Sequence, residues 1–390
     1  MKLKNKLLKK SIFLLLISSI LCSCTVSDES SSKAESVESA LGVSENDSEF
    51  ESETESSNLS VEEESGEASE ISVEISEDAT SVEEESSDIT EISEESSQSE
   101  NNSSDTESSE EEDYPYVEPS VTIDSAGERF ADKFTDGEII QTETSYQSAN
   151  VNVTLKEITF GGKLFFVQDI YIKNIESFSA GFAGLKLGAK YNDFVFDMVE
   201  DYRNAGYNVI GAVNGDYCGI NGVKNLKGAI IRNGKLYGTG KAEYTVCVLY
   251  KNGHMRTIPK NRFNAELEIE RGAWQAWDFG PSFLAEDGSA LTSFTERKSI
   301  SGSGNPRTAI GYYEPGHYCF ITAGGRTTSQ KYGVSFKQMS AFAESLGCNL
   351  AYNLDGGESA VMVFGNDIVN EEYQGTGRRN SDIVFIMDIQ

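Results

Sequence analysis

The spacing of apolar and polar side chains predicts two long strands early in the folded part of the chain. Residues 150–160, NVNVTLKEITF, alternate between apolar and polar side chains, which indicates a strand with one buried face. Residues 163–175, KLFFVQDIYIKNI, form a mostly apolar run and predict a second strand. We therefore expect the folded part to begin with β-structure.

Two later stretches each predict a helix followed by a strand. Residues 194–206 and 335–347 carry apolar side chains at helical spacing and end in a glycine, which is typical of a helix end. A short apolar strand follows each helix and ends in a polar cluster, the place where α/β folds commonly put their chemistry. If the two strands are neighbours, the clusters converge. The clusters comprise Asn214, Gly215 and Asp216 after the first helix, and Asn353, Asp355, Gly356, Gly357 and Glu358 after the second.

Two further pairs of strands are predicted between these units. Residues 221–240 contain an Asn-Gly turn between apolar residues, the usual signal of a tight hairpin. Residues 305–326 contain two apolar runs joined by a Pro-Gly turn. With many strands and few helices, the fold class is predicted to be α+β, or mixed α/β. Residues 114–390 are enough for one large domain or two closely joined lobes.

The net charge of −32 comes almost entirely from one segment. Residues 25–113 hold 32 Asp and Glu against a single Lys, and they contain almost no aromatic residues. Such a composition cannot bury enough apolar area to offset chain entropy, so residues 24–113 are predicted to form a disordered, self-repelling linker. The alternative is an acidic tract that captures cations or a basic partner.

The first 23 residues have the pattern of an export signal. A lysine-rich start precedes an apolar run that is too short to span a bilayer. The sequence LCSC at residues 21–24 resembles a bacterial lipoprotein signal, which implies lipidation of Cys24 and tethering to the outer face of the membrane. An ordinary cleaved signal peptide is the alternative. Both interpretations export the protein.

Four cysteines remain in the folded part of an exported chain: Cys218, Cys247, Cys319 and Cys348. An even number allows two disulfides with three connectivities. Buried free thiols are equally consistent with so few cysteines in a large domain.

Carboxylates are the best candidates for catalysis. The two histidines, His254 and His317, are expected at surface turns, so hydrolases that depend on a histidine base are disfavoured. Asp216, Asp355 and Glu358 lie among glycines and asparagines. Arg307 follows a proline and offers a planar clamp for a phosphate.

The order of several motifs resembles the phosphodiester glycosidase family, which has many exported bacterial members. The resemblance covers about residues 195–390 and rests on the motifs AVNGDY (212–217), GAIIRNGKLY (228–237), NPRTAIG (305–311), GCNLAYNLDGGESAVMVF (347–364), VN (369–370) and SDIVFI (381–386). It implies hydrolysis of a sugar 1-phosphodiester, between the anomeric carbon and the phosphate oxygen, in cell-surface or extracellular glycans. A non-catalytic glycan-binding lipoprotein and a phosphodiesterase that releases sugar 1-phosphate are the alternatives.

The resemblance also implies the site residues. The implied catalytic residues are Asp355, Asp216 and Arg307. The implied substrate-binding residues are Asn214, Gly215, Thr308, Asn353, Gly356 and Gly357. Glu358 stands where the family commonly has a third glycine. Ser329, Arg326 and Gly333 are further candidates for a loop that faces the phosphate. Lys227 is a candidate to contact the phosphate anion.

No cofactor is expected to be required. The carboxylates nevertheless offer oxygen ligands that would suit a Ca²⁺ or Mg²⁺ ion bound between them. The predicted partners are a sugar-phosphate glycan and a membrane reached through the lipid anchor alone, with no nucleic acid. Trp274 and Trp277 are expected either to stack against a sugar or to be buried in the core.

Overall fold

The computed structural model describes residues 114–187, 192–216, 228–325, 332–370 and 377–389. The predicted signal peptide and acidic linker lie outside these residues. So do Cys24, Cys218, Lys227, Arg326 and Ser329, together with the predictions made for them.

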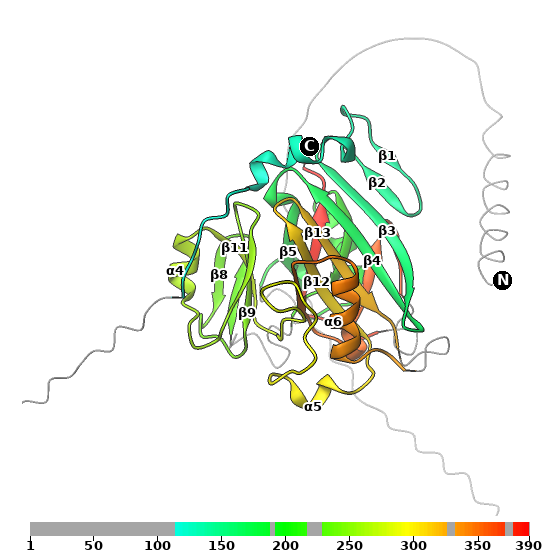
Figure 1. Cartoon of the computed structure of the whole chain (residues 1–390). Helices are drawn as coiled ribbons and strands as arrows, with labels where there is room; N and C mark the ends of the chain where they lie inside the picture. Colours follow the sequence, from blue (N-terminus) through cyan, green and yellow to red (C-terminus); the bar gives the residue numbers. More distant parts are fainter. Residues whose placement is uncertain (1–113, 188–191, 217–227, 326–331, 371–376, 390) are drawn as a thin grey trace, which may run out of the picture. The chain divides into compact units, whose positions relative to one another are not determined.

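The described residues form three antiparallel sheets, several strands of which are labelled in Figure 1. The first sheet consists, in spatial order, of β1 (Ile140–Gln141), β2 (Ser145–Gln147), β3 (Val151–Phe160), β4 (Lys163–Ile172), β13 (His317–Ala323), β12 (Arg307–Glu314) and β14 (Leu350–Asn353). The second sheet consists of β16 (Asp367–Ile368), β15 (Met362–Phe364), β6 (Val209–Asn214), β17 (Asp382–Met387) and β5 (Phe178–Phe182). The third sheet consists of β10 (Met255–Ile258), β9 (Val246–Tyr250), β11 (Ala273–Trp277), β7 (Ala229–Arg232) and β8 (Lys235–Gly238).

Short α-helices accompany the sheets in the part of the chain that the structure describes. They are α2 (Ala126–Arg129), α3 (Val195–Asn204), α4 (Ala265–Glu270), α5 (Lys298–Ser301) and α6 (Phe336–Ser345). Single-turn 3-10 helices lie at η1 (Ile123–Ser125), η2 (Ala131–Lys133), η3 (Ile175–Ser177), η4 (Ala183–Leu185) and η6 (Gly357–Ser359). The sheet-rich α+β class predicted from the sequence is therefore confirmed.

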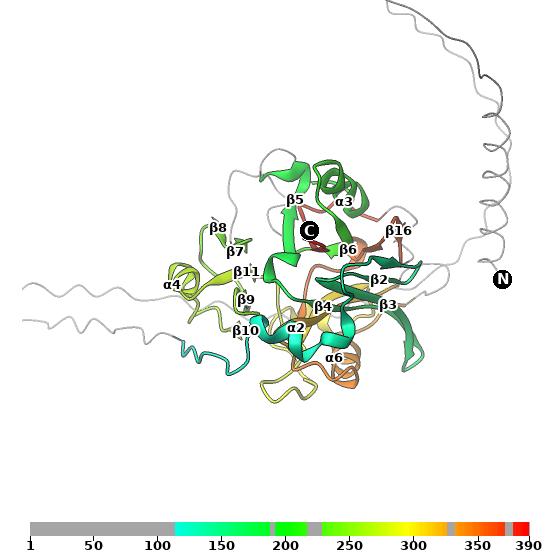
Figure 2. The same ribbon diagram turned by 90° about the horizontal axis from the view of Figure 1, so that it is seen from above.

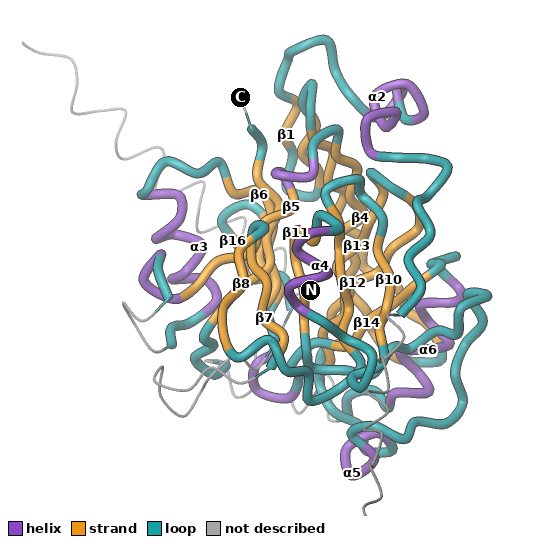
Figure 3. The backbone as a smooth tube through the Cα atoms, turned by 90° about the vertical axis from the view of Figure 1, so that its left-hand side faces the viewer, coloured by secondary structure: helices purple, strands orange, loops and turns teal. Residues whose placement is uncertain are grey.

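The first and second sheets pack face to face, and each has a helix on its outer face. In β4, Phe166 joins the central core between the sheets, whereas its neighbours Phe165 and Val167 pack with α6. In β17, Val384 joins the same central core, whereas Ile383 packs with α3 on the other side. Figure 3 shows α3 and α6 at opposite sides of the two sheets. Because both faces of these strands are buried, they appear in the sequence as almost continuous apolar runs.

The third sheet lies beside the other two, as the view from above shows (Figure 2). It has its own small core, against which α4 and the side chains of Tyr114 and Tyr116 pack. The predicted Asn-Gly hairpin joins β7 and β8, and Asn233 and Gly234 both have the positive φ that such a turn requires. The other predicted strand pairs and both predicted helices are also confirmed. Ser335 caps the N-terminus of α6.

Two aromatic predictions are decided by the packing. Trp277 is fully buried, and the indole Nε1 of the half-buried Trp274 donates to the Phe178 carbonyl at 2.7 Å. The interpretation of these tryptophans as packing residues is thus supported. Turns precede both histidines as predicted, but His254 and His317 are half-buried. His317 stacks between Tyr171 and Tyr313, and its Nε2 lies 2.8 Å from Asp169.

No helix among the described residues is long and apolar enough to cross a membrane.

Candidate active site

Three segments from two different sheets meet at Asn214. This residue ends β6 in the second sheet and is fully buried. Its Nδ2 donates to the Asp355 carbonyl at 2.8 Å, and its Oδ1 accepts from Thr308 Oγ1 at 2.7 Å. From the sequence, the two polar clusters are expected to converge if β6 and β14 are neighbouring strands. The two strands are not neighbours in a sheet, yet the residues at their ends lie together. The convergence is produced by sheets that pack face to face, so strand order alone does not give it.

The glycines of these segments allow close approach of the chain to itself. A Cβ on Gly215 would lie 2.3 Å from the Asp382 carboxylate, and a Cβ on Gly356 would lie 2.8 Å from the Pro306 carbonyl oxygen. Neither distance is tolerated by an ordinary side chain. Gly357 has φ +65°, a conformation that favours glycine. These contacts explain the DGG and NGD sequences by packing, and direct contacts of the glycines with a substrate remain a prediction.

Asp355 is a buried carboxylate with a charged partner that is partly exposed. Its Oδ1 accepts from the Gly356 amide at 2.9 Å, and its Oδ2 accepts from Ser359 Oγ at 2.7 Å. Oδ2 also pairs with Arg378 Nη2 at 2.6 Å, and the Arg378 side chain is 38% exposed. Burial raises the pKa of the Asp355 carboxyl above its ordinary value, while Ser359, Arg378 and the Gly356 amide oppose that shift. Such a carboxyl can exchange a proton with a bound molecule.

Asp216 has a different environment, because it belongs to a buried ion triad. Arg232 Nη2 lies 2.6 Å from Asp216 Oδ1 and 2.9 Å from Asp382 Oδ2. The side chains of all three residues are at most 3% exposed. The second oxygen of Asp216 accepts from the Asp278 amide at 3.0 Å. The triad links β7 to β17 and to the end of β6, so Asp216 is held in place on both of its oxygens.

Asp278 and Arg297 extend the charged surroundings of the two aspartates. Asp278 accepts from the amides of Ala229, Glu243 and Tyr244. Burial raises the pKa of the Asp278 carboxyl, the three amides oppose the shift, and the charge of Asp216 adds to it. The Arg297 guanidinium stacks on Tyr244 and Phe279 at 4.0 and 3.9 Å from the ring centres, and its charge acts to lower the pKa of Asp355.

Arg307 holds backbone at the start of β12. Its Nε donates to the Val334 carbonyl at 3.1 Å, and its Nη2 donates to the carbonyls of Ile300 and Ser303 at 2.7 and 3.0 Å. The guanidinium also lies 4.5 Å over the Phe336 ring, and the residue is only 2% exposed. These contacts favour a positioning role, and a direct contact with phosphate remains a prediction.

Asn353 and Glu358 complete the predicted set. Asn353 Nδ2 donates to the Gly280 carbonyl at 2.8 Å, whereas its Oδ1 is buried without a donor among the described residues. A buried acceptor without a partner is costly, typically about 1–3 kcal/mol. Glu358 is half-buried in η6, and its backbone carbonyl accepts from the Arg378 amide at 2.9 Å. Thus Glu358 helps to position the arginine that pairs with Asp355.

The segments of the candidate site lie within a match to a known protein family. The phosphodiester glycosidase family matches residues 207–387, which include the ends of β6 and β14 and the start of β12. The resemblance to the phosphodiester glycosidase family is confirmed. The part of this chain that matches the family also contains Arg232, Arg378 and Asp382.

Solved structures and a curated relative are similar to parts of the chain. The catalytic domain of zebrafish N-acetylglucosamine-1-phosphodiester alpha-N-acetylglucosaminidase, auto-inhibited by its pro-peptide, is 17% identical with a TM-score of 0.50; the match covers 66% of this chain and 86% of that one. A putative exported protein from Burkholderia pseudomallei K96243 is 13% identical with a TM-score of 0.40, over 58% and 75% of the two chains. The SPbeta prophage-derived uncharacterized protein YomE of Bacillus subtilis (strain 168) is 27% identical over 165 residues. This alignment covers 41% of the present chain and about a quarter of the length of YomE.

Sequence reasoning missed four charged residues of this phosphodiester glycosidase-like site: Arg232, Asp278, Arg297 and Arg378. Arg378 lies 23 residues after its partner Asp355, and Arg232 lies 16 residues after Asp216. No local pattern connects such pairs. A signal was nevertheless present, because GAIIRNGKLY and SDIVFI were both recognised as family motifs and contain Arg232 and Asp382.

The described part of the phosphodiester glycosidase-like domain has no group of three or more His, Cys, Asp or Glu side chains suited to hold a metal ion. Binding of Ca²⁺ or Mg²⁺ therefore stays a prediction.

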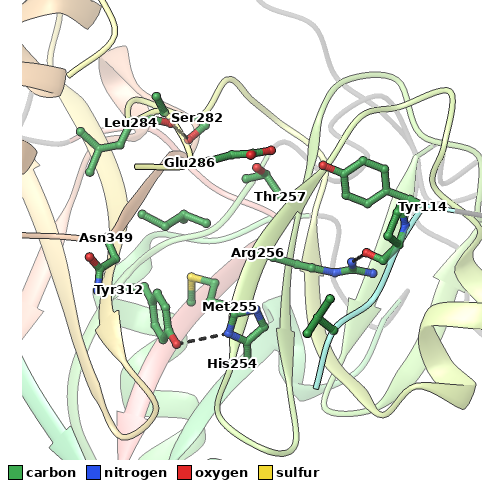
Figure 4. Close-up of a pocket in the computed structure, with 14 residues that line it drawn as sticks. Tyr114, His254, Met255, Arg256, Thr257, Ser282, Leu284, Glu286, Tyr312 and Asn349 are labelled. Carbon is green, nitrogen blue, oxygen red and sulfur yellow. Dashed lines mark hydrogen bonds between the residues drawn. The ribbon is translucent and has the colours of Figure 1, made fainter. Parts of the chain in front are cut away.

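A cavity of about 540 Å³ lies elsewhere in the domain (Figure 4). It is lined by Tyr114, residues of β10, Glu286, Tyr312 and Asn349. Figure 4 shows the hydrogen bond between His254 and Tyr312. None of the residues that line it belongs to the predicted site. We place the candidate site at the three converging segments, because the family motifs and the Asp355–Arg378 pair lie there.

Arg307→Lys is expected to lower the free energy of unfolding by about 1–3 kcal/mol, because an ammonium on a flexible stem cannot serve three carbonyls and stack on Phe336. Urea unfolding followed by circular dichroism measures the change. Arg379→Lys, at an arginine whose side chain is 48% exposed and pairs with Asp193, is the control and should change stability by less than about 1 kcal/mol. Unchanged stability in Arg307→Lys would contradict the positioning role.

Proposed function

We propose that this protein is an exported hydrolase that cleaves a sugar 1-phosphodiester between the sugar C1 and the phosphate oxygen. The observation that carries the proposal is the convergence of the three family motifs at Asn214, which holds the backbone of Asp355, a buried carboxylate paired with the partly exposed Arg378. The zebrafish protein, by its name, acts on an N-acetylglucosamine 1-phosphodiester, which supports the same class of substrate. The natural substrate is proposed to be a glycan at the cell surface or outside the cell.

The reaction adds water across the bond between C1 and oxygen. The water oxygen bonds to C1, the bond from C1 to the phosphate oxygen breaks, and its electron pair stays on the phosphate. A leaving phosphate needs little protonation, so stabilising its charge is the main requirement. We assign this task to Arg378, whose guanidinium is partly exposed beside Asp355. Asp355, in its ionised form, accepts the proton of the attacking water.

The other site residues position this pair. Asn214 holds the backbone of Asp355 and the hydroxyl of Thr308, and Arg307 holds the start of β12. Asp216, fixed by Arg232 and by the Asp278 amide, is assigned to positioning because the cation that it pairs with is buried together with it. The orphaned Asn353 Oδ1 is proposed to accept a hydrogen bond from a sugar hydroxyl.

Export and membrane attachment are part of the proposal. The lysine-rich, apolar start and the LCSC sequence support a lipoprotein signal, with Cys24 as the lipidated residue. The acidic segment then separates the catalytic domain from the membrane surface.

Product analysis tests the reaction and separates the alternatives. The purified chain is incubated with a nucleotide sugar as the sugar 1-phosphodiester, and the products are identified by mass spectrometry. Free sugar together with a nucleoside diphosphate is the expected result. Sugar 1-phosphate together with a nucleoside monophosphate would mean cleavage at phosphorus. Binding without turnover across a panel of sugar phosphodiesters would favour the glycan-binding alternative.

The acidic side of the pH profile is expected to report Asp355. A base acts only when it is ionised, so kcat/KM should rise with pH as the carboxyl loses its proton. Because burial raises the pKa of Asp355, this rise should lie above the range of an ordinary Asp. The measurement is kcat/KM against pH in buffers of constant ionic strength. A rate that stays flat down to the ordinary pKa range of aspartate would contradict the assignment of Asp355 as the base.

A further inference from the structure

Two buried cysteines from distant parts of the chain lie in contact. Cys319 is in β13 and is fully buried, and Cys348, 3% exposed, lies between α6 and β14. Their Sγ atoms are 3.8 Å apart. Both side chains belong to the apolar cluster between the first sheet and α6. Neither residue takes part in the reaction proposed above.

The sheet leaves room for the two sulfur atoms. Gly311 of β12 pairs with Cys319 on one side and with Ala351 of β14 on the other. A Cβ on Gly311 would lie 2.4 Å from the Cys319 Sγ and 3.0 Å from the Cys348 Sγ. The two sulfurs therefore share the space above a glycine in a strand that is otherwise occupied by larger residues. A larger residue at position 311 would push the two sulfurs apart.

Little movement separates this contact from a covalent bond. A disulfide has an S–S distance of about 2.0 Å, so the sulfurs would approach by about 1.8 Å, and the movement is shared between two side chains. The Tyr313 side chain interacts with both thiols, and its ring stacks on His317. Cys247, Cys319 and Cys348 are all free thiols in the structure, but Cys247 lies in the separate central core.

We propose that Cys319 and Cys348 are joined by a disulfide in the exported protein. This inference rests on the export that is part of the proposed function, because disulfides persist in oxidising compartments. Two thiols lose two protons and two electrons as the S–S bond forms, and the oxidant is a protein or small-molecule disulfide that becomes a dithiol. The bond closes a loop containing residues 320–347, which includes α6, and it attaches the start of β14 to β13. It therefore fixes the position of β14, the strand that leads to Asn353 and Asp355.

The bond is expected to form before the core closes. Pairing with Cys348 and burial both raise the pKa of the Cys319 thiol, so the reactive thiolate is disfavoured once the domain is folded. Oxidation during folding avoids this barrier.

Refolding in redox buffers tests the proposal without relying on export or activity. The full chain is reduced, denatured and refolded in mixtures of oxidised and reduced glutathione, then trapped with N-ethylmaleimide and digested. Mass spectrometry is expected to find the Cys319 peptide linked to the Cys348 peptide, with Cys247 alkylated. Full alkylation of Cys319 and Cys348 in the most oxidising mixture, or a link from either one to Cys218, would overturn it.

Thermal unfolding gives a second readout. The chain refolded under oxidising conditions should have a Tm about 5–10 °C higher than the same chain refolded with reductant, the scale expected for a loop of about 30 residues. The difference should persist in Cys247→Ala, the matched control at another buried thiol. It should vanish in the double variant Cys319→Ala with Cys348→Ala. An equal difference in that double variant would contradict the proposal.

Discussion

Replacing Asp355 with Asn is expected to lower kcat by about 10²–10⁴-fold, the usual contribution of a positioned general base. The amide has the same size as the carboxyl and keeps an oxygen for the Gly356 amide, but it cannot take a proton from water. The pair with Arg378 is partly exposed, so its loss should change the free energy of unfolding by only about 1 kcal/mol. Steady-state hydrolysis of a nucleotide sugar and urea unfolding measure the two effects.

The chain contains a closely matched control for this variant. Asp193 is also buried and pairs, at 2.9 Å, with Arg379, the residue next to Arg378. It lies outside the converging segments and accepts from the Phe194 amide. Asp193→Asn therefore removes a buried, arginine-paired carboxylate without touching the candidate site. Wild-type kcat in Asp355→Asn, or an equal loss of kcat in Asp193→Asn, would remove Asp355 from the mechanism.

Arg232→Met is expected to have the largest effect on stability, a loss of about 3–5 kcal/mol in the free energy of unfolding. Methionine fills much of the space of the arginine stem, but it leaves Asp216 and Asp382 buried without their shared cation. Urea unfolding followed by circular dichroism gives the magnitude. Lys133→Met, which removes a cation from an exposed pair with Asp132, should cost less than about 1 kcal/mol.

A rescue experiment shows whether the unpaired carboxylates cause that loss. Adding Asp216→Asn and Asp382→Asn to Arg232→Met removes both buried charges, so part of the lost stability should return. If the triple variant is no more stable than Arg232→Met, the loss comes from packing around the guanidinium and not from charge. Each pair is close enough for its effects to be non-additive, so the single variants are measured as well.

The assignment of different roles to the two aspartates follows from these environments. Asp216 lies in a buried ion triad that joins three strands, whereas Asp355 faces an arginine that is 38% exposed. Both carboxylates accept from protein donors on each oxygen, but the cation that pairs with Asp216, Arg232, is only 1% exposed, which suits Asp216 to positioning. A carboxyl with a raised pKa beside a partly exposed cation is suited to proton transfer.

Much of the fold could be predicted from the sequence, because local periodicity reports which side of each element is buried. The alternation in β3, the helical spacing in α3 and α6, and the turn at Asn233 and Gly234 all depend on residues close together in the chain. The sequence motifs of the phosphodiester glycosidase family likewise identified the segments that form the candidate site. These signals are local, so a single sequence contains them.

The arrangement of the site was decided by tertiary structure alone. Local periodicity does not specify which sheet a strand joins, and so the contact between the ends of β6 and β14 came from the packing of two sheets. The partners Arg232 and Asp382 are 150 residues apart, and Asp355 meets Arg378 across η6 and the strands after it. The glycines of NLDGGES, which the sequence suggested would bind a substrate, have structural reasons: Gly356 is required by the approach of the Pro306 carbonyl, and Gly357 has a positive φ. Side-chain direction and long-range packing set these contacts, and neither is encoded in the spacing of neighbouring residues.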